Sequence, residues 1–263
     1  MTRPAGSAHP IARRRVVLIT GASSGIGRAT ANAFAAQGDT VVGVGRDRDR
    51  LQAVHDECGA EVIQSSIETA RACVEVVDHV HRRFGPIDIL VNNAGRGGYL
   101  DESIDEATPE GWRKMIAVNL DAPFELTRLS VADMRKRRWG RIIMVGSTAS
   151  QVGAPNMTGY CASKHGLLGL MRAVANDVAA DHVTCNAVCP GWVRTEMAER
   201  DAEIEAEARG LTPSDVWKER EAASPARRVL EPTEVANVVA FLGSDLSSGI
   251  NGEAITVALG GAW

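Results

Sequence analysis

Long apolar runs and paired cysteines are both missing from this chain of 263 residues. No run of 18 apolar residues occurs, so the sequence holds no candidate transmembrane helix. The cysteines form no C-x-x-C pair and lack a histidine spacing suited to zinc, which indicates reduced thiols in a cytoplasmic protein and no metal site. The five cysteines are Cys58, Cys73, Cys161, Cys185 and Cys189. We expect Cys185 and Cys189 to be small buried apolar residues.

An excess of positive charge is missing too, because the formal net charge is -4. Such a chain has no general attraction for nucleic acid or for an anionic membrane, and we expect neither as a partner. One basic run, residues 135–141, has no aromatic stacking surface beside it. Basic residues at the end of a helix are better explained as complements of the helix dipole.

No internal repeat, low-complexity block or linker divides the chain. Residues 1–14 are rich in arginine, proline and glycine and lack the apolar run of a signal peptide, so we interpret them as a disordered leader. The length suits one large α/β domain. We therefore expect one domain over residues 15–263.

Short β-branched runs alternate with helix-periodic segments from Arg15 onward. This alternation predicts an α/β fold with a doubly wound parallel sheet and helices on both faces. The expected strands are residues 15–20, 40–45, 61–65, 87–92, 141–146, 183–188 and 253–258.

A glycine-rich turn lies between the first expected strand and the first expected helix. Its pattern, T-G-x-x-x-G-x-G, begins at Thr20. Glycines allow a tight bend and a close approach to a pyrophosphate, whose charge the helix N-terminus would meet. A plain loop is the alternative interpretation.

The second expected strand ends at Gly45 and Arg46, where dinucleotide folds bind the adenosine ribose. A guanidinium can bind a 2'-phosphate with two parallel hydrogen bonds, which favours NADP(H) over NAD(H). Alternatively, Asp47 only caps the next helix, and it could then still serve NAD(H).

Three polar residues follow or interrupt apolar segments farther along the chain. Asn93 leaves the carboxyl end of the fourth expected strand, where such sheets bind ligands, although a simple turn would look the same. Asn119 falls within the apolar run of a long helix that we expect from Thr108 to about Arg138, and its role there could be purely structural. Ser147 follows the fifth strand and could be a cap or a hydrogen-bond donor to a substrate oxygen.

Tyr160 and Lys164 lie four residues apart in an expected helix from Met157 to about Ala180, so they share one face. A positive charge beside a phenol favours the phenolate and would lower its pKa toward neutrality. The pair could serve as a general acid and base. Taken alone, it could equally be an ordinary amphipathic helix face.

The sixth strand leads into Pro190–Thr195, and an acidic, alanine-rich helical segment follows. We expect a mobile lid over the substrate at about residues 195–228, although a solvated helical face would explain its charge equally well.

Together these motifs resemble the short-chain dehydrogenase/reductase family, and the resemblance covers residues 15–260. Its distinguishing features are TGxxxGxG at the first turn, N-N-A-G at Asn92, YxxxK at Tyr160 and P-G-W-V-R-T at Pro190. The resemblance implies a single Rossmann-type sheet of seven strands. It also implies a catalytic tetrad of Asn119, Ser147, Tyr160 and Lys164.

In such a tetrad, Tyr160 passes its proton to the carbonyl oxygen and Ser147 orients that oxygen. Lys164 lowers the tyrosine pKa and holds the nicotinamide ribose, and Asn119 holds a relay water. Thr195 and the Val193 backbone bind the nicotinamide carboxamide. The family usually has an acidic residue for adenine where Ser66 and Ile67 stand here. The full set of implied cofactor-binding residues is Gly21, Ser23, Ser24, Gly25, Ile26, Gly27, Arg46, Ser66, Ile67, Asn93, Ala94, Gly95, Tyr160, Lys164, Pro190, Gly191, Val193 and Thr195.

Within the family, the segment Asn93–Gly98 and the sequence N-A-V-C-P-G at Asn186 are similar to polyketide ketoreductases and 3-oxoacyl thioester reductases. NADPH-dependent reduction of a ketone or 3-oxoacyl group is therefore expected, by a homo-oligomer that is a tetramer or a dimer. Two alternatives stay open. One is an NAD-dependent secondary-alcohol or 3-hydroxy-acid dehydrogenase that works oxidatively, and the other is a catalytically silent nucleotide sensor.

Overall fold

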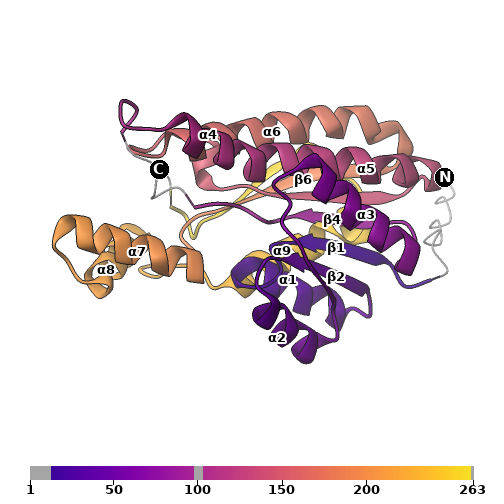
Figure 1. The fold of residues 1–263 in the computed structure, drawn as a ribbon, viewed down its shortest axis with the longest axis horizontal. Helices are drawn as coiled ribbons and strands as arrows, with labels where there is room; N and C mark the ends of the chain where they lie inside the picture. Colours follow the sequence, from indigo (N-terminus) through magenta and orange to yellow (C-terminus); the bar gives the residue numbers. More distant parts are fainter. Residues whose placement is uncertain (1–12, 98–102, 262–263) are drawn as a thin grey trace, which may run out of the picture.

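The computed structural model describes residues 13–97 and 103–261, which form three layers around one parallel sheet (Figure 1). The sheet order is β3-β2-β1-β4-β5-β6-β7. This confirms the predicted α/β fold with seven parallel strands. The strands are β1 (Val16–Thr20), β2 (Thr40–Gly45), β3 (Glu61–Gln64), β4 (Ile89–Asn92), β5 (Gly140–Val145), β6 (Val183–Pro190) and β7 (Ala254–Val257).

Helices cover both faces of the sheet, because its strands are apolar on both sides. In β1, Val16 and Leu18 face one apolar core, while Val17 and Ile19 face the other. Figure 1 shows α3, α4, α5 and α6 on one face and α1, α2 and α9 on the other. These helices are α1 (Gly25–Ala36), α2 (Arg48–Cys58), α3 (Ala70–Phe84), α4 (Pro109–Ile116), α5 (Ala122–Arg137), α6 (Thr158–Val178) and α9 (Pro232–Leu242).

The single long helix predicted across Asn119 is wrong in one respect. A π-helical turn, Ala117–Asp121, separates α4 from α5, and Asn119 lies in its middle. The wider i→i+5 turn changes the helical phase locally, and a 3.6-residue periodicity does not reveal it. Such turns occur frequently at functional sites.

Two remaining helices, α7 (Glu196–Arg209) and α8 (Pro213–Ala223), form a pair that stands apart from the three layers in Figure 1. The α7–α8 pair has its own small apolar cluster. Ala198, Ala202 and Ala206 lie one turn apart on α7 and pack with Val216 and Trp217 of α8. Gly210 ends α7 in a left-handed conformation, and Pro213 begins α8.

The basic residues at the end of α5 bind groups of this chain. Arg137 pairs with the fully buried Asp88 at 3.2 Å, and Arg138 donates to the carbonyl of Ala180 at 3.0 Å. Asp88 also pairs with Arg13, at the end of the expected leader, whose residues 1–12 lie outside the described part. The ion pairs and hydrogen bonds of this basic run therefore join the C-terminal end of α5 to neighbouring segments.

Candidate active site

The glycine turn after β1 leaves no room for side chains. Gly21 and Gly25 have φ of +67° and +49°, a region that glycine adopts without strain. A Cβ on Gly27 would lie 2.1 Å from the carbonyl oxygen of Gly21. The turn Gly21–Ser24 and the first turn of α1, called the glycine cradle below, thus expose backbone where a ligand could approach.

The N-terminus of α1 differs from those of most other helices in the described part of the chain. Ser24 makes no side-chain cap bond, and no acidic residue lies in the first turn. Side chains cap α2, α3, α4, α7 and α8. The N–H groups of α1 and its positive dipole end are therefore left for an anion, and the cradle fits the pyrophosphate of a dinucleotide.

The segment after β4 fixes this turn from the side. The Asn93 Nδ2 donates to the carbonyl oxygens of Thr20 at 2.8 Å and Gly21 at 3.2 Å. The Thr20 hydroxyl accepts from the backbone of Asn93 at 3.1 Å and of Ala94 at 3.0 Å. Asn93 is thus more than a turn residue, because it joins two of the predicted motifs.

Ser147 and Tyr160 meet at the carboxyl end of β5. Their hydroxyl groups are hydrogen-bonded to each other. Ser147 also caps the short 3₁₀ turn Thr148–Ser150, accepting from the Ala149 N–H at 3.1 Å. The two interpretations of Ser147 left open by the sequence are therefore compatible, since the capping bond fixes the hydroxyl beside the phenol.

Lys164 lies one helical turn from Tyr160, and its Nζ is 5.7 Å from the centre of the tyrosine ring. The Nζ donates to the carbonyl of Val145 at 2.8 Å. Burial lowers the pKa of Lys164 to about 8. Burial also raises the pKa of Tyr160 to about 12, while the bond from Ser147 acts in the opposite direction.

The expected lowering of the tyrosine pKa toward neutrality by Lys164 is not met in this structure, because burial raises that pKa. Removing the phenolate from water costs more than the hydrogen bond from Ser147 returns, and the charge of Asp201 adds to that cost. Tyr160 consequently keeps its proton at neutral pH. A protonated phenol beside a serine hydroxyl is a proton donor.

The Asn119 side chain links two segments of the site. Its Oδ1 accepts from the Arg96 N–H at 2.8 Å, and its Nδ2 donates to the Ser163 hydroxyl at 3.1 Å. Ser163 in turn donates to the carbonyl of Tyr160 at 2.8 Å. Sequence reasoning missed Ser163, although it lies inside YxxxK, because serine is common on helices.

The loop after β6 returns to the glycine cradle. Thr195 caps α7, and a Cβ on Gly25 would lie 2.9 Å from its Cγ2. Val193 is buried and pairs with Leu230, and the Gly191 N–H donates to the carbonyl of Val257 at 2.9 Å. The predicted segment Pro190–Thr195 is thus held against the first turn.

At the far end of the cradle, Arg46 is largely exposed and lies 3.7 Å from the Glu68 carboxylate. Asp47 caps α2 by accepting from the Arg50 N–H at 3.1 Å, as the alternative interpretation predicted. The Ser66 hydroxyl accepts from the Glu68 N–H at 3.3 Å, and the Ile67 side chain is buried in the core. The structure thus leaves Arg46 accessible.

Four strand ends therefore bring the predicted residues together over one edge of the sheet. Thr20, Asn92, Val145 and Pro190 end β1, β4, β5 and β6, which are adjacent. Arg46, Ser66 and Ile67 follow β2 and β3, at the outer side of the cradle. Of the quoted motif Asn93–Gly98, Gly98 lies outside the described residues.

The α7–α8 pair adds residues that the sequence did not single out. Arg220 is buried between the rings of Trp192 and Trp217, at 3.8 and 4.9 Å from their centres. It pairs with Glu205 at 2.9 Å and donates to the carbonyl of Ala198 at 3.2 Å. Long-range stacking of this kind has no local sequence signature.

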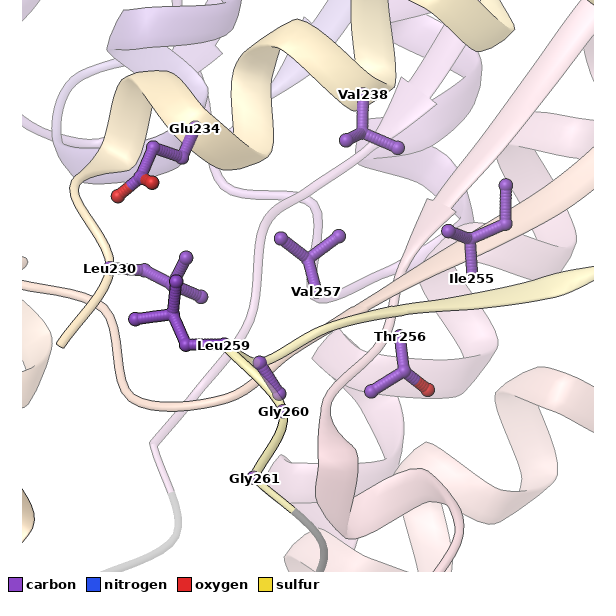
Figure 2. Close-up of a pocket in the computed structure, with 10 residues that line it drawn as sticks. Leu230, Glu234, Val238, Ile255, Thr256, Val257, Leu259, Gly260 and Gly261 are labelled. Carbon is purple, nitrogen blue, oxygen red and sulfur yellow. The ribbon is translucent and has the colours of Figure 1, made fainter. Parts of the chain in front are cut away.

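A separate pocket lies between α9 and β7, at the outer edge of the sheet (Figure 2). Its lining is mostly apolar, with Glu234 at one side, and it includes none of the tetrad. The buried Cys185 and Cys189 are confirmed as core residues. Within residues 13–97 and 103–261 no cluster of three potential metal ligands is found, and no helix there is long and apolar enough to cross a membrane.

Comparison with known proteins adds independent information. A family model described as enoyl-(acyl carrier protein) reductase matches residues 21–261. A Streptomyces virginiae protein described as a ketoacyl reductase of the monensin polyketide synthase is 39% identical over 250 residues, covering 92% of this chain and 95% of that protein. The Escherichia coli 3-oxoacyl-[acyl-carrier-protein] reductase FabG is 35% identical over 245 residues, covering 92% and 95%.

Among solved structures, a point variant of the actinorhodin polyketide ketoreductase with NADPH superposes with a TM-score of 0.90. It is 31% identical, and the match covers 95% of this chain and 98% of that one. The match thus spans nearly the whole of both chains.

Proposed function

This chain belongs to the short-chain dehydrogenase/reductase family and is an NAD(P)-dependent oxidoreductase acting on carbonyl and alcohol groups; from this we propose that it reduces a ketone or a 3-oxoacyl thioester with NADPH. The observation that carries the proposal is the hydrogen-bonded pair of Ser147 and Tyr160, with Lys164 on the next turn of α6. When bound, the cofactor supplies the hydride.

The tetrad would supply the proton and the orientation. Tyr160, which holds its proton because burial raises its pKa, donates it to the carbonyl oxygen. The Ser147 hydroxyl stabilises the charge that develops on that oxygen. Lys164 would bind the nicotinamide ribose with the two N–H donors that its bond to the Val145 carbonyl leaves free. Asn119 positions the Arg96 backbone relative to α6 through its hydrogen bonds to both. Its part in a water relay, taken from the resemblance, stays a proposal.

The cofactor preference for NADPH rests on Arg46. Its guanidinium is exposed at the end of β2, and Asp47 is occupied as a helix cap. A 2'-phosphate would compete with Glu68 for the same cation. The pairing with Glu68 is also the observation that favours the alternative, an NAD-dependent dehydrogenase working oxidatively, because it neutralises Arg46.

We also infer that the α7–α8 pair is the predicted lid at about residues 195–228, within one domain of residues 15–263. The exposed Trp112 and Phe124 on α4 and α5 support assembly into a homo-oligomer, with a tetramer as our proposal. All five cysteines are free, which supports a cytoplasmic location.

The proposal is tested by steady-state kinetics with ketones, 3-oxoacyl thioesters and their alcohols, in both directions and with both cofactors. We expect turnover of a ketone, with a kcat/KM at least tenfold higher with NADPH than with NADH. Arg46→Ala should reduce that ratio, whereas the matched change Arg48→Ala, on the first turn of α2, should leave it unchanged. Cofactor binding without turnover of any carbonyl would favour the silent sensor, and a preference for NADH with alcohols would favour the dehydrogenase.

A further inference from the structure

Asp201 is an acidic residue on α7 that the tetrad does not include. Its carboxylate packs against the backbone of Gly97, because a Cβ on that glycine would lie 3.2 and 3.3 Å from the two carboxylate oxygens. The Cγ of Met197, one turn earlier on α7, would lie equally close, at 3.3 Å. Asp201 and Met197 thus share the face of α7 that meets the segment after β4.

That segment connects Asp201 to the tetrad. Two residues before Gly97, a Cβ on Gly95 would lie 3.6 Å from the Nζ of Lys164 and 3.5 Å from the Oδ1 of Asn119. The charge of Asp201 also acts on Tyr160, whose phenolate it disfavours by raising the pKa. The carboxylate therefore lies on the side of α7 that faces the reacting groups.

Within the part of the chain that the structure describes, Asp201 lacks the hydrogen-bond donors that a half-buried carboxylate ordinarily has. Among residues 13–97 and 103–261, no side chain or backbone N–H donates a hydrogen bond to it. Arg220, the cation whose charge acts on it, is stacked between two tryptophans and paired with Glu205. Burial raises the pKa of Asp201 to about 6, with a further increase from Glu205. Its oxygens thus have acceptor capacity that no donor among the described residues uses.

We propose that Asp201 is a substrate-recognition residue, which accepts a hydrogen bond from a hydroxyl group of an uncharged ketone and disfavours ketones that carry a carboxylate. The inference rests on the proposed function and specifies its substrate class. A hydroxyl donor would satisfy the free oxygens, whereas a second carboxylate would place two like charges in a site of low dielectric. A neutral ester or thioester is compatible with it, and a free 3-oxo acid is not.

The test uses four small ketones at pH 8 with saturating NADPH: ethyl acetoacetate, acetoacetate, 4-hydroxy-2-butanone and 2-butanone. We expect the natural chain to prefer the ester over acetoacetate by at least 100-fold in kcat/KM. It should prefer the hydroxylated butanone over 2-butanone by about tenfold. Asp201→Asn should raise kcat/KM for acetoacetate about tenfold, and Asp201→Leu should abolish the preference for the hydroxyl group.

Glu203→Gln is the matched control, because it removes the same charge from an exposed position two residues along α7. It should leave all four values unchanged. NADPH binding, followed by fluorescence, checks that each variant is folded. Unchanged selectivity in both Asp201 variants would overturn the assignment. If the natural chain reduced no ketone at all, the proposed function would fail and this inference with it.

Discussion

The glycine cradle and the α7–α8 pair meet at Thr195, yet different kinds of contact stabilise each of them internally. In the cradle, backbone packs on backbone, and a single added carbon on Gly27 would collide with Gly21. In the α7–α8 pair, small alanines form the contact, while long charged and aromatic side chains such as Arg220 and Trp217 bind its parts together. Almost no amino-acid substitution fits in the cradle, whereas the side chains that stabilise the α7–α8 pair can be substituted one at a time.

We propose that this difference separates two tasks of the enzyme, cofactor binding by the cradle and substrate recognition by the α7–α8 pair. A pyrophosphate is the same in every dinucleotide, so a rigid backbone site serves it. Substrate shape differs from enzyme to enzyme, and a side-chain network can change without disturbing the sheet. Asn119, Ser147, Tyr160 and Lys164 lie in the π-helical turn, at the end of β5 and on α6, and Lys164 and Asn119 lie beside Gly95 of the segment after β4.

Tyr160→Phe should have the largest effect and should leave both regions intact. We expect kcat to fall about 10³-fold or more, because the proton donor is lost while the ring still fills its place. NADPH affinity should stay within about threefold of the natural chain. His165→Gln, an exposed change on the same helix, is the control. Near-normal turnover of the phenylalanine variant would refute the role of Tyr160.

Gly27→Ala tests the cradle itself. The new methyl group would lie 2.1 Å from the Gly21 carbonyl and 2.5 Å from the Asn93 Nδ2, so the turn must open. We expect a loss of NADPH affinity of about 100-fold, measured by fluorescence titration. Gly249→Ala, at a position where an added Cβ meets nothing within 4 Å, should bind NADPH normally. Equal affinity in the two variants would show that the cradle is more adaptable than its geometry indicates.

The sequence predicted the cradle residue by residue but predicted the α7–α8 pair only as an acidic, alanine-rich helical segment. Gly21, Gly25 and Gly27 act through local backbone geometry, which their spacing reveals. The stacking of Arg220 on Trp192 joins residues 28 positions apart, and no periodicity marks such a contact. The strand bounds were right to within about two residues, since β-branched runs define them.

Two expectations from the sequence differ from the structure: the direction of the Tyr160 pKa shift and the continuity of the helix across Asn119. Lys164 was expected to lower the Tyr160 pKa, but the cost of burying both groups can be judged only once the fold is known. The hydrophobic periodicity did not reveal the π-helical turn around Asn119. Asp201 was not predicted as a site residue. The alanines that mark the packed face of α7, Ala198, Ala202 and Ala206, nevertheless show that Asp201 lies next to that face.

Arg220→Leu tests whether the α7–α8 pair can change without affecting the cradle. It removes a hydrogen bond worth about 2 kcal/mol to the Glu205 carboxylate, which Arg209 still binds at 2.7 Å, and it removes the side-chain donor to the Ala198 carbonyl. We expect KM for a ketone to rise about tenfold, with NADPH affinity changed by less than threefold. A parallel loss of NADPH affinity would show instead that Thr195 couples the two regions.

Asp201→Asn should have the smallest effect, and the size of that effect depends on pH. Burial raises the pKa of Asp201 from 3.8 to about 6, so ionisation is harder in the folded chain than in the unfolded chain. The folded state therefore loses stability as pH rises from about 4 to 6, and above 6 the cost is constant. Arg220 opposes this cost, Glu205 adds to it, and Tyr160 stays neutral across the range.

Because the Asp201 side chain is partly open to solvent, we expect a cost of about 1 kcal/mol rather than the full value of the shift. Asp201→Asn should thus be more stable than the natural chain by about 1 kcal/mol at pH 7.5, in urea unfolding. The difference should vanish near pH 4, where both side chains are neutral. Glu203→Gln should show no such trend. A pH-independent difference would mean that Asp201 acts through packing, whereas the expected trend would show that α7 keeps a destabilising carboxylate beside the tetrad.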